Sequence, residues 1–323
     1  MIYKKISNVN LQVSTISLGS AFFGSTINKK EAFGLMDTFE DQGGNFLDTA
    51  HIYADWLPIE KSISEKTIGE WMKLKKNRNR LVIGTKGAHP DFSHMEIPRL
   101  SKENVTSDLE GSLRALQTDY IDLYWLHRDD ENRPVAQILE YLNEHVKSGK
   151  ILSFGCSNWK AHRIVEALEY ADKNGLKSFV ANQNMWSYAE PNVENFKDKT
   201  LVVMKEDAKE MHLSSGMAAI PFSSQANGFF SKLQVNNLSE QIKDLYYNEE
   251  NVARFKRAKK VADTLGVNIN DVALSYLISQ PFVTIPVVGC RTKEQLYDSL
   301  KASDLSLSKA TLNYLENGVE NNE

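Results

Sequence analysis

The feature of the sequence that most constrains the fold is an alternation of short apolar runs with longer amphipathic stretches, repeated eight times along the chain. The runs are too short for helices, whereas the stretches space their apolar residues as an amphipathic helix does. Strands that each lead into a helix predict a parallel sheet closed into a (β/α)8 TIM barrel, because helical crossovers return the chain to the same direction. The predicted strands cover 16–19, 45–48, 81–85, 121–126, 151–156, 179–182, 217–220 and 283–288.

The stretches between these runs carry signals for the ends of helices. Ser62 and Glu65 have the spacing of a capping box, and Pro134 has the position of a first-turn proline. The predicted helices cover 29–42, 62–74, 101–116, 134–148, 161–173, 198–211, 252–265, 271–279 and 293–300.

Two segments lie outside the alternation. Residues 1–15 are expected to form a β-hairpin that closes the bottom of the barrel. Residues 223–251 contain no predicted element. Because long loops in a compact domain are usually lids or binding loops, we expect this second segment to fold over a ligand.

Length and composition indicate one globular domain. The 323 residues match the size of a single α/β barrel, so 1–323 is predicted to be one catalytic domain. The 38 basic and 42 acidic residues are interspersed, which predicts neither a nucleic-acid nor a membrane partner. The two cysteines have no disulfide or zinc spacing, and no apolar run approaches the roughly 18 residues of a membrane span, so a cytoplasmic location is expected. Nothing in the sequence predicts the oligomeric state.

Polar side chains follow the predicted strands at their carboxyl ends, where barrels gather their chemistry. Asp48, Lys86 and His127 end three neighbouring strands, and Tyr53 follows five residues after Asp48. Taken singly, Asp48 would be a helix cap and Tyr53 a packing residue. Lys86 would be a surface lysine in a loop and His127 a solvated histidine. Together at one mouth they predict a catalytic group, since a lysine there is costly to bury without a paired acid.

The chemistry of this quartet suits reduction of a carbonyl. A phenol has a reference pKa near 10, and a neighbouring cation lowers that value. We therefore expect Lys86 to acidify Tyr53, Asp48 to hold the ammonium, and His127 to orient the substrate carbonyl. The hydride must come from a cofactor.

Several segments of the chain resemble the aldo-keto reductase superfamily. These are 46–53 (FLDTAHIY), 83–86 (IGTK), 104–127, 155–158 (GCSN) and 285–289, in register from about residue 3 to 300. The resemblance implies a barrel that binds NADP(H), with NAD(H) as the alternative, and reduces an aldehyde or ketone with Tyr53 as general acid. Asp48 and Lys86 would tune the acid, and His127 would orient the substrate.

The resemblance also implies a set of cofactor contacts at the same mouth. Ser157, Asn158 and Gln183 would bond the nicotinamide carboxamide, and Phe222 would stack on its ring where the family usually has tyrosine. Ser223, Gln225 and the Gly228 region would embrace the pyrophosphate. Gly289, Arg291, Thr292 and Gln295 lie at the adenosine end, where Arg291 would grip a 2′-phosphate through its fork of donors. The segment 221–225 and the pair Asp298 and Ser299 depart from the family pattern, which concerns cofactor affinity and preference.

The substrate is left open by the sequence. Phe22, Trp56, Trp159 and Trp186 follow strands and are candidates for an apolar pocket wall, although aromatic residues near barrel strands are usually core. The segment 89–100 and the residues after Arg128 would instead offer polar contacts to a sugar-like substrate.

The sequence is also compatible with two alternatives to a small-molecule carbonyl reductase. One is a cofactor-binding, redox-sensing regulatory protein with little turnover. The other is a metal-dependent barrel hydrolase, which would need His51, His127 and Asp48 as ligands; their spacing is atypical of a metal site, and no metal is expected.

Overall fold

Eight parallel strands form one sheet in the order β10-β3-β4-β5-β6-β7-β8-β9. The computed structural model describes residues 1–7 and 9–319. The strands are β3 (Ser17–Gly19), β4 (Phe46–Asp48), β5 (Val82–Gly87), β6 (Ile121–Leu126), β7 (Ile151–Ser157), β8 (Ala181–Gln183), β9 (Ala218–Ala219) and β10 (Val287–Val288). The predicted strand order is therefore confirmed, with boundaries shifted by a few residues.

The sheet closes between β9 and the segment before β10 through individual backbone hydrogen bonds, not through a continuous ladder. Ala219 forms an isolated parallel bridge with Thr284. Its N–H donates to Val283 O at 2.8 Å, and its carbonyl accepts from Ile285 N at 2.8 Å. These contacts complete the (β/α)8 barrel that the sequence predicts.

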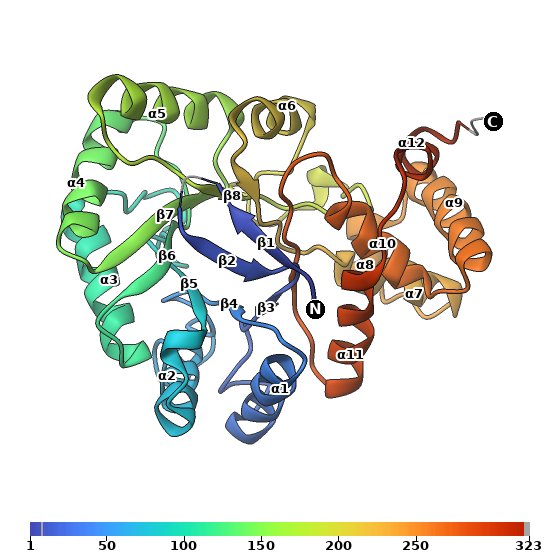
Figure 1. Cartoon of the computed structure of the whole chain (residues 1–323), viewed down its shortest axis with the longest axis horizontal. Helices are drawn as coiled ribbons and strands as arrows, with labels where there is room; N and C mark the ends of the chain where they lie inside the picture. The colour runs from blue at the N-terminus through green and yellow to red at the C-terminus, as the bar shows by residue number, and fades with distance from the viewer. Residues whose placement is uncertain (8, 320–323) are drawn as a thin grey trace.

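Helices surround the strands on the outside of the barrel (Figure 1). One helix follows each of the first six strands: α1 (Lys29–Asp41), α2 (Ile63–Lys75), α3 (Lys102–Leu116), α4 (Val135–Lys147), α5 (Ala161–Asn174) and α6 (Glu206–Ser215). The remaining helices lie in the C-terminal third: α7 (Phe229–Gln234), α8 (Glu240–Tyr246), α9 (Glu249–Leu265), α10 (Ile269–Ile278), α11 (Lys293–Lys301) and α12 (Lys309–Asn317).

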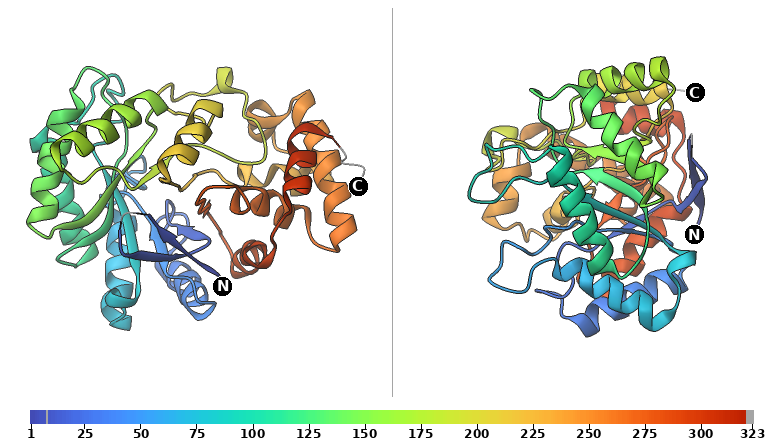
Figure 2. Two further views of the ribbon diagram at one scale, coloured as in Figure 1. Left: turned by 45° about the horizontal axis from the view of Figure 1, so that its top comes forward. Right: turned by 90° about the vertical axis from the view of Figure 1, so that its left-hand side faces the viewer.

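The predicted N-terminal hairpin is present and plugs one end of the barrel. Strand β1 (Tyr3–Ile6) pairs antiparallel with β2 (Leu11–Ser14). Ile6, Leu11 and Val13 join Phe46 and Leu123 of the barrel strands in one buried cluster. In the side view of Figure 2 the dark-blue hairpin lies at one end, and the light-blue and teal loops after β4 and β5 project from the other. The mouth at which the candidate catalytic residues were predicted is thus the end away from the hairpin.

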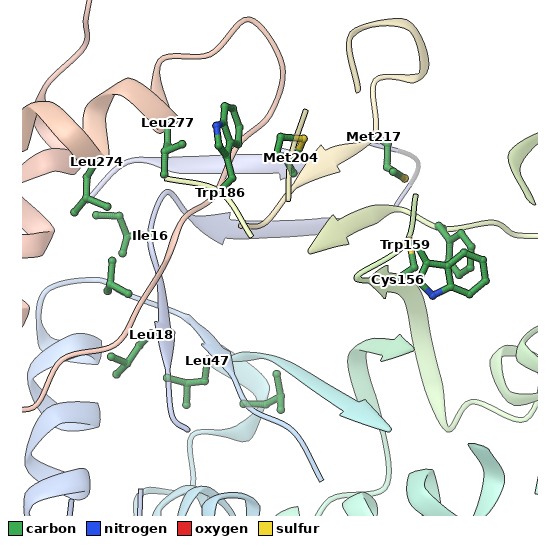
Figure 3. Packing of buried hydrophobic residues seen from close by; sticks show 14 of the residues in the cluster. Ile16, Leu18, Leu47, Cys156, Trp159, Trp186, Met204, Met217, Leu274 and Leu277 are labelled. Carbon is green, nitrogen blue, oxygen red and sulfur yellow. The ribbon is translucent and has the colours of Figure 1, made fainter. Parts of the chain in front are cut away.

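A larger apolar core lies between the strands and the helices. Figure 3 shows Leu18 and Leu47 of the strands in this core, with Leu274 and Leu277 of α10. This packing holds the strands in place, so the loops at their carboxyl ends rest on a rigid support.

Three local predictions are wrong. Ser62 does not cap α2: its backbone is left-handed at φ 55°, it makes no side-chain cap bond, and Glu65 turns inward instead. The segment 223–251 is not without elements, since it contains α7 and α8. Helix α6 begins at Glu206 instead of residue 198, because the residues before it run extended and Met185 bridges Val203.

One further boundary and one further helix also differ from the prediction. Pro134 stands just before α4 as its N-cap residue, not inside the first turn. Helix α12 was not predicted at all; it packs on α9, and Leu315 is buried there.

Candidate active site

The lysine that ends β5 joins an acid and a tyrosine from the neighbouring strand and its loop. Lys86 Nζ donates to Asp48 Oδ2 at 2.6 Å, to Thr49 O at 2.8 Å and to Tyr53 Oη at 3.0 Å. Strands β4 and β5 are paired with Asp48 opposite Gly84. Lys86 therefore lies two residues further along β5 than the partner of Asp48. The three side chains predicted to act together are in direct contact.

Burial shapes the ionisation of this group. It lowers the pKa of Lys86, but the charge of Asp48 and the interaction with the Tyr53 hydroxyl, to which Lys86 donates, raise it more, and the net pKa lies above the usual lysine value. The ammonium therefore stays charged at neutral pH.

The expectation of an acidified phenol is wrong in this environment. Burial raises the pKa of Tyr53, and although the charge of Lys86 lowers it, the net pKa lies above the usual value of 10.0. Desolvation of the phenolate is the largest cause, and the negative charge of Asp48 adds to it, so the two together outweigh the effect of the Lys86 cation. Tyr53 thus keeps its proton at neutral pH, which is the form a general acid requires.

The histidine that follows β6 lies beside the tyrosine. The rings of His127 and Tyr53 meet edge to face with centroids 6.1 Å apart. Burial, the Arg128 cation and neighbouring His89 hold the pKa of His127 well below its usual value, so the ring is neutral. Its Nδ1 is buried and has no hydrogen-bond partner among the described residues.

The three residues predicted to hold a carboxamide lie together but are already engaged with the protein. Gln183 Nε2 donates to Asp48 Oδ1 at 2.9 Å, and Ser157 Oγ donates to Gln183 O at 2.8 Å. Asn158 has a left-handed backbone at φ 59°, and its Oδ1 accepts from Val202 N at 3.1 Å. These bonds fix the orientation of all three side chains at the mouth beside Asp48.

The residues expected at the far end of a cofactor form two groups. Gln225 donates to Asn270 Oδ1 at 3.1 Å and to Ser299 Oγ at 3.0 Å, which links the β9 loop to α10 and α11. In the sequence Gln225 comes after the partly exposed Phe222 and Ser223 and before Gly228, whose backbone is left-handed at φ 76°.

The second group stands at the start of α11. Thr292 caps this helix, and Gln295 Oε1 accepts from Arg291 N at 2.9 Å. Gly289 is exposed, and a Cβ added there would contact nothing within 4 Å. An open backbone beside a helix start with an exposed arginine fits the phosphate groups of a dinucleotide.

A buried acid anchors the loop that carries Tyr53, and the sequence had suggested only a capping role for it. Glu65 Oε1 accepts from Thr85 Oγ1 at 2.6 Å, and its Oε2 pairs with His51 Nδ1 at 3.0 Å. A Cβ on Gly111 of α3 would lie 2.6 Å from His51 Cε1, so α3 closes over the histidine ring. The loop is therefore fixed to α2, β5 and α3.

Arg128 was also missed, because its partner lies 70 residues away in the sequence. Its Nη2 donates to Asp198 Oδ2 at 2.8 Å, its Nε to Thr200 Oγ1 at 2.7 Å and its Nη1 to His127 O at 2.8 Å. It fastens the 198–200 segment to the end of β6. The local signal in the sequence was an arginine directly after a candidate histidine.

The candidate pocket walls divide into two kinds. Trp159 packs against Phe179 with centroids 5.0 Å apart, and Trp186 stacks on Phe282 at 6.0 Å; both tryptophans are core (Figure 3). Phe22 and Trp56 are 38% and 44% exposed and remain available to a ligand.

Two of the three residues required by the hydrolase alternative have other partners. Asp48 pairs with Lys86, and His51 pairs with Glu65. Within residues 1–7 and 9–319, no three His, Cys, Asp or Glu side chains gather as metal ligands would.

The fold and the site define a class of protein. The model of the Aldo/keto reductase family matches residues 15–320, and the chain belongs to that family. Across the part of the chain that the structure covers, no helix has the length and apolarity needed to cross a membrane.

Relatives over nearly the whole chain are oxidoreductases by name. Norsolorinic acid reductase B of Dothistroma septosporum is 30% identical, covering 98% of this chain and 81% of that protein. The uncharacterized oxidoreductase YrpG of Bacillus subtilis is 31% identical, and the match covers 98% of this chain and 95% of that protein. The aryl-alcohol dehydrogenase [NADP(+)] of Phanerodontia chrysosporium is 30% identical, and the match covers 97% of this chain and 84% of that protein.

A solved structure supports the fold independently. The crystal structure of a thermostable aldo-keto reductase, Tm1743, with the inhibitor epalrestat superimposes with a TM-score of 0.72 at 23% identity. The superposition covers 98% of this chain and 99% of the chain of the solved structure. At that identity the likeness concerns the (β/α)8 architecture alone.

Proposed function

We propose that this protein is an NADPH-dependent reductase of aldehydes or ketones, acting as one catalytic domain, with Tyr53 as its general acid. The observation that carries the proposal is the Lys86 ammonium bonded at once to Asp48 and to the Tyr53 hydroxyl. This arrangement offers a proton donor and a nearby cation to the oxygen of a carbonyl.

Each of the four side chains has a part in the proposed reaction. Tyr53 donates its phenolic proton to the carbonyl oxygen as the carbon is reduced, and an alcohol results. Lys86 stabilises the phenolate that remains, and Asp48 keeps the ammonium in place. When bound, the reduced nicotinamide supplies the hydride.

His127 orients the substrate through the one ring nitrogen left free to donate. Because its Nδ1 is buried with no acceptor among the described residues, the neutral ring is more stable with its proton on Nε2. An Nε2–H can donate to the same carbonyl oxygen that Tyr53 protonates, which fixes the carbonyl without competing for the proton.

Two observations favour NADPH over NADH. Arg291 is exposed at the start of α11, where a guanidinium can bind a 2′-phosphate with two donors. One relative carries NADP(+) in its name.

The proposal is tested by replacing the phenol. Tyr53→Phe removes the proton donor but keeps the ring, so kcat for aldehyde reduction should fall at least about 100-fold. NADPH affinity, measured by quenching of protein fluorescence, should stay within about twofold. Tyr3→Phe, at a residue that is 43% exposed in the hairpin at the opposite end of the barrel, serves as the matched control and should leave both quantities unchanged.

Two results would contradict this assignment. Loss of NADPH binding in Tyr53→Phe would mean that the tyrosine holds the cofactor instead of the proton. Tight NADPH binding by the unaltered protein, with no turnover of any aldehyde or ketone in a broad panel, would favour the regulatory alternative.

A further inference from the structure

A pocket lies beside the barrel mouth, where helices α5 and α6 begin. It has a volume of about 350 Å³ and is bounded by residues of 160–161, 193–203 and 205–208, together with Asn184. The two helices lie next to each other (Figure 1). Its walls, which all belong to the described part of the chain, include none of the candidate catalytic or cofactor-binding residues. We refer to it as the lateral pocket.

The charges around the lateral pocket favour an anion. Its ionisable lining residues are three lysines and one acid: Lys160, Lys199, Lys205 and Asp207. Asp207 Oδ1 already accepts from Ala208 N at 2.9 Å. Lys160 pairs with Glu131 at 2.7 Å, but both side chains are more than half exposed, so this pair is weak. Lys199 Nζ donates to a neutral backbone carbonyl, Glu194 O, at 3.0 Å. The pocket therefore has an excess of positive charge.

Both helices begin at the lateral pocket with a residue that is unfavourable there. Lys160 is the N-cap residue of α5 and Lys205 is the N-cap residue of α6, and neither makes a side-chain cap bond. The start of a helix carries unsatisfied N–H groups and a partial positive charge, so Ser, Thr, Asp or Asn is preferred and a cation is disfavoured. Two such helix starts around one pocket provide donors and positive charge that a bound phosphate would satisfy.

A buried asparagine adds an unsatisfied acceptor to this pocket. Asn184 lines the lateral pocket and is only 1% exposed. Its Nδ2 donates to Trp159 O at 3.0 Å, and its Oδ1 has no hydrogen-bond partner among the described residues. Because a buried acceptor without a donor is costly, an occupant that brings a hydroxyl group would relieve this cost.

The wall formed by 193–203 is held in place by bonds to the barrel. Arg128 Nη2 donates to Asp198 Oδ2 at 2.8 Å. Val202 N donates to Asn158 Oδ1 at 3.1 Å. These bonds are made by the protein alone, so the pocket does not need an occupant in order to form, as is usual for ligand sites.

We propose that the lateral pocket is a second ligand site, which binds a small phosphomonoester that also carries a hydroxyl group. Three lysines and two helix starts favour a doubly charged phosphate over a singly charged carboxylate, and Asn184 accepts from the hydroxyl. Ligand pockets usually measure about 300–1,000 Å³, a range that includes this one. The inference does not depend on the proposed function, because no candidate catalytic or cofactor-binding residue takes part.

The test is a calorimetric titration of the Arg291→Ala protein with glycerol 3-phosphate. This background removes the exposed arginine proposed to bind the cofactor phosphate, so the signal does not come from that residue. Binding should persist, and Lys199→Ala with Lys205→Ala should weaken it at least about tenfold, since two charge-assisted contacts are lost. Both lysines are exposed, so the variant should fold. Lys173→Ala with Lys256→Ala removes the same charge from exposed positions elsewhere and should change nothing.

The contact of Asn184 is tested with a second ligand. n-Propyl phosphate has the same chain length as glycerol 3-phosphate but no hydroxyl group, and should bind roughly fivefold more weakly. In Asn184→Leu the two ligands should bind equally, because the unsatisfied acceptor is gone. Urea unfolding shows whether this variant folds, and the comparison of the two ligands in the protein that retains Asn184 does not depend on it.

Three results would overturn the proposed site. The first is no binding of glycerol 3-phosphate up to about 10 mM. The second is binding that Lys199→Ala with Lys205→Ala leaves unchanged. The third is equal weakening in both lysine double variants, which would show an effect of net charge alone. Equal binding of the two phosphates by the protein that retains Asn184 would overturn the proposed hydroxyl contact.

Discussion

At the scale of single residues, the site depends on an ammonium that is almost completely removed from water. The side chains of Lys86 and Asp48 are 1% and 2% exposed, and their charges compensate each other. A buried pair of this kind contributes little net stability compared with a well-packed apolar pair, but removing one partner leaves the other charge uncompensated. The pair is therefore more informative about chemistry than about folding.

Lys86→Met should destabilise the protein by about 3–5 kcal/mol, because Asp48 is left buried without its cation. Urea unfolding measures this change. The double variant Asp48→Asn with Lys86→Met removes both charges and should recover most of the lost stability while remaining inactive. If the single and double variants were equally unstable, the cost would lie in packing and not in the uncompensated charge.

Arg291→Ala should weaken NADPH binding by roughly 10-fold or more and NADH binding by less than about twofold, since only NADPH carries the 2′-phosphate. Fluorescence titration with each nucleotide measures both effects. Arg291→Lys keeps the charge but loses the fork of donors, and is expected to lie between the two. Equal weakening of both nucleotides would refute the phosphate assignment.

At the scale of elements, the loop between β4 and α2 decides where Tyr53 lies. This loop is tied down by His51 and Glu65, and the left-handed Ser62 ends it. Burial lowers the pKa of His51, but Glu65 raises it more, and the net pKa lies above the usual value of 6.5. A histidine whose pKa is raised by folding stabilises the folded state fully below its unfolded pKa, and this contribution is lost as the pH rises through its folded pKa.

His51→Gln should therefore lower the thermal unfolding midpoint most near pH 6, and the difference from the unaltered protein should shrink as the pH rises above 6.5. Scanning calorimetry across this range measures it. His162→Gln, on the exposed surface of α5, is the matched control and should show no such pH dependence. A difference that is constant with pH would indicate a packing role for His51 without an ion pair.

At the scale of the whole molecule, the stabilising hairpin and the candidate catalytic residues lie at opposite ends of the barrel. The hairpin buries Ile6 completely in the barrel interior, while Asp48, Lys86 and Tyr53 gather at the other end. Substitutions that affect activity and substitutions that affect fold stability can therefore be separated experimentally, as is general for barrels.

Ile6→Ala should lower the free energy of unfolding by about 2–5 kcal/mol, because it leaves a cavity between the hairpin and the barrel. The KM for aldehydes and the affinity for NADPH should be unchanged. Ile2→Ala, at a residue that is 54% exposed, should change neither quantity and controls for the substitution. Altered substrate kinetics in Ile6→Ala would show that the two ends of the barrel are coupled.

Much of this architecture could be predicted because it depends on local pattern. The alternation of apolar runs with amphipathic stretches determines eight strand and helix units, and helical crossovers make the strands parallel. Parallel strands bring their carboxyl ends to one side, so Asp48, Lys86 and His127 were predicted to meet without knowledge of any contact.

Only the tertiary structure decided which of two local roles each ambiguous residue takes. Glu65 has the spacing of a cap but bonds Thr85 and His51, and Trp159 follows a strand but packs into the core. The pKa of Tyr53 depends on how much water the surrounding loops remove, which sequence spacing does not report. These outcomes are set by neighbours distant in the chain, whereas the order of the barrel is set by neighbours within a few residues.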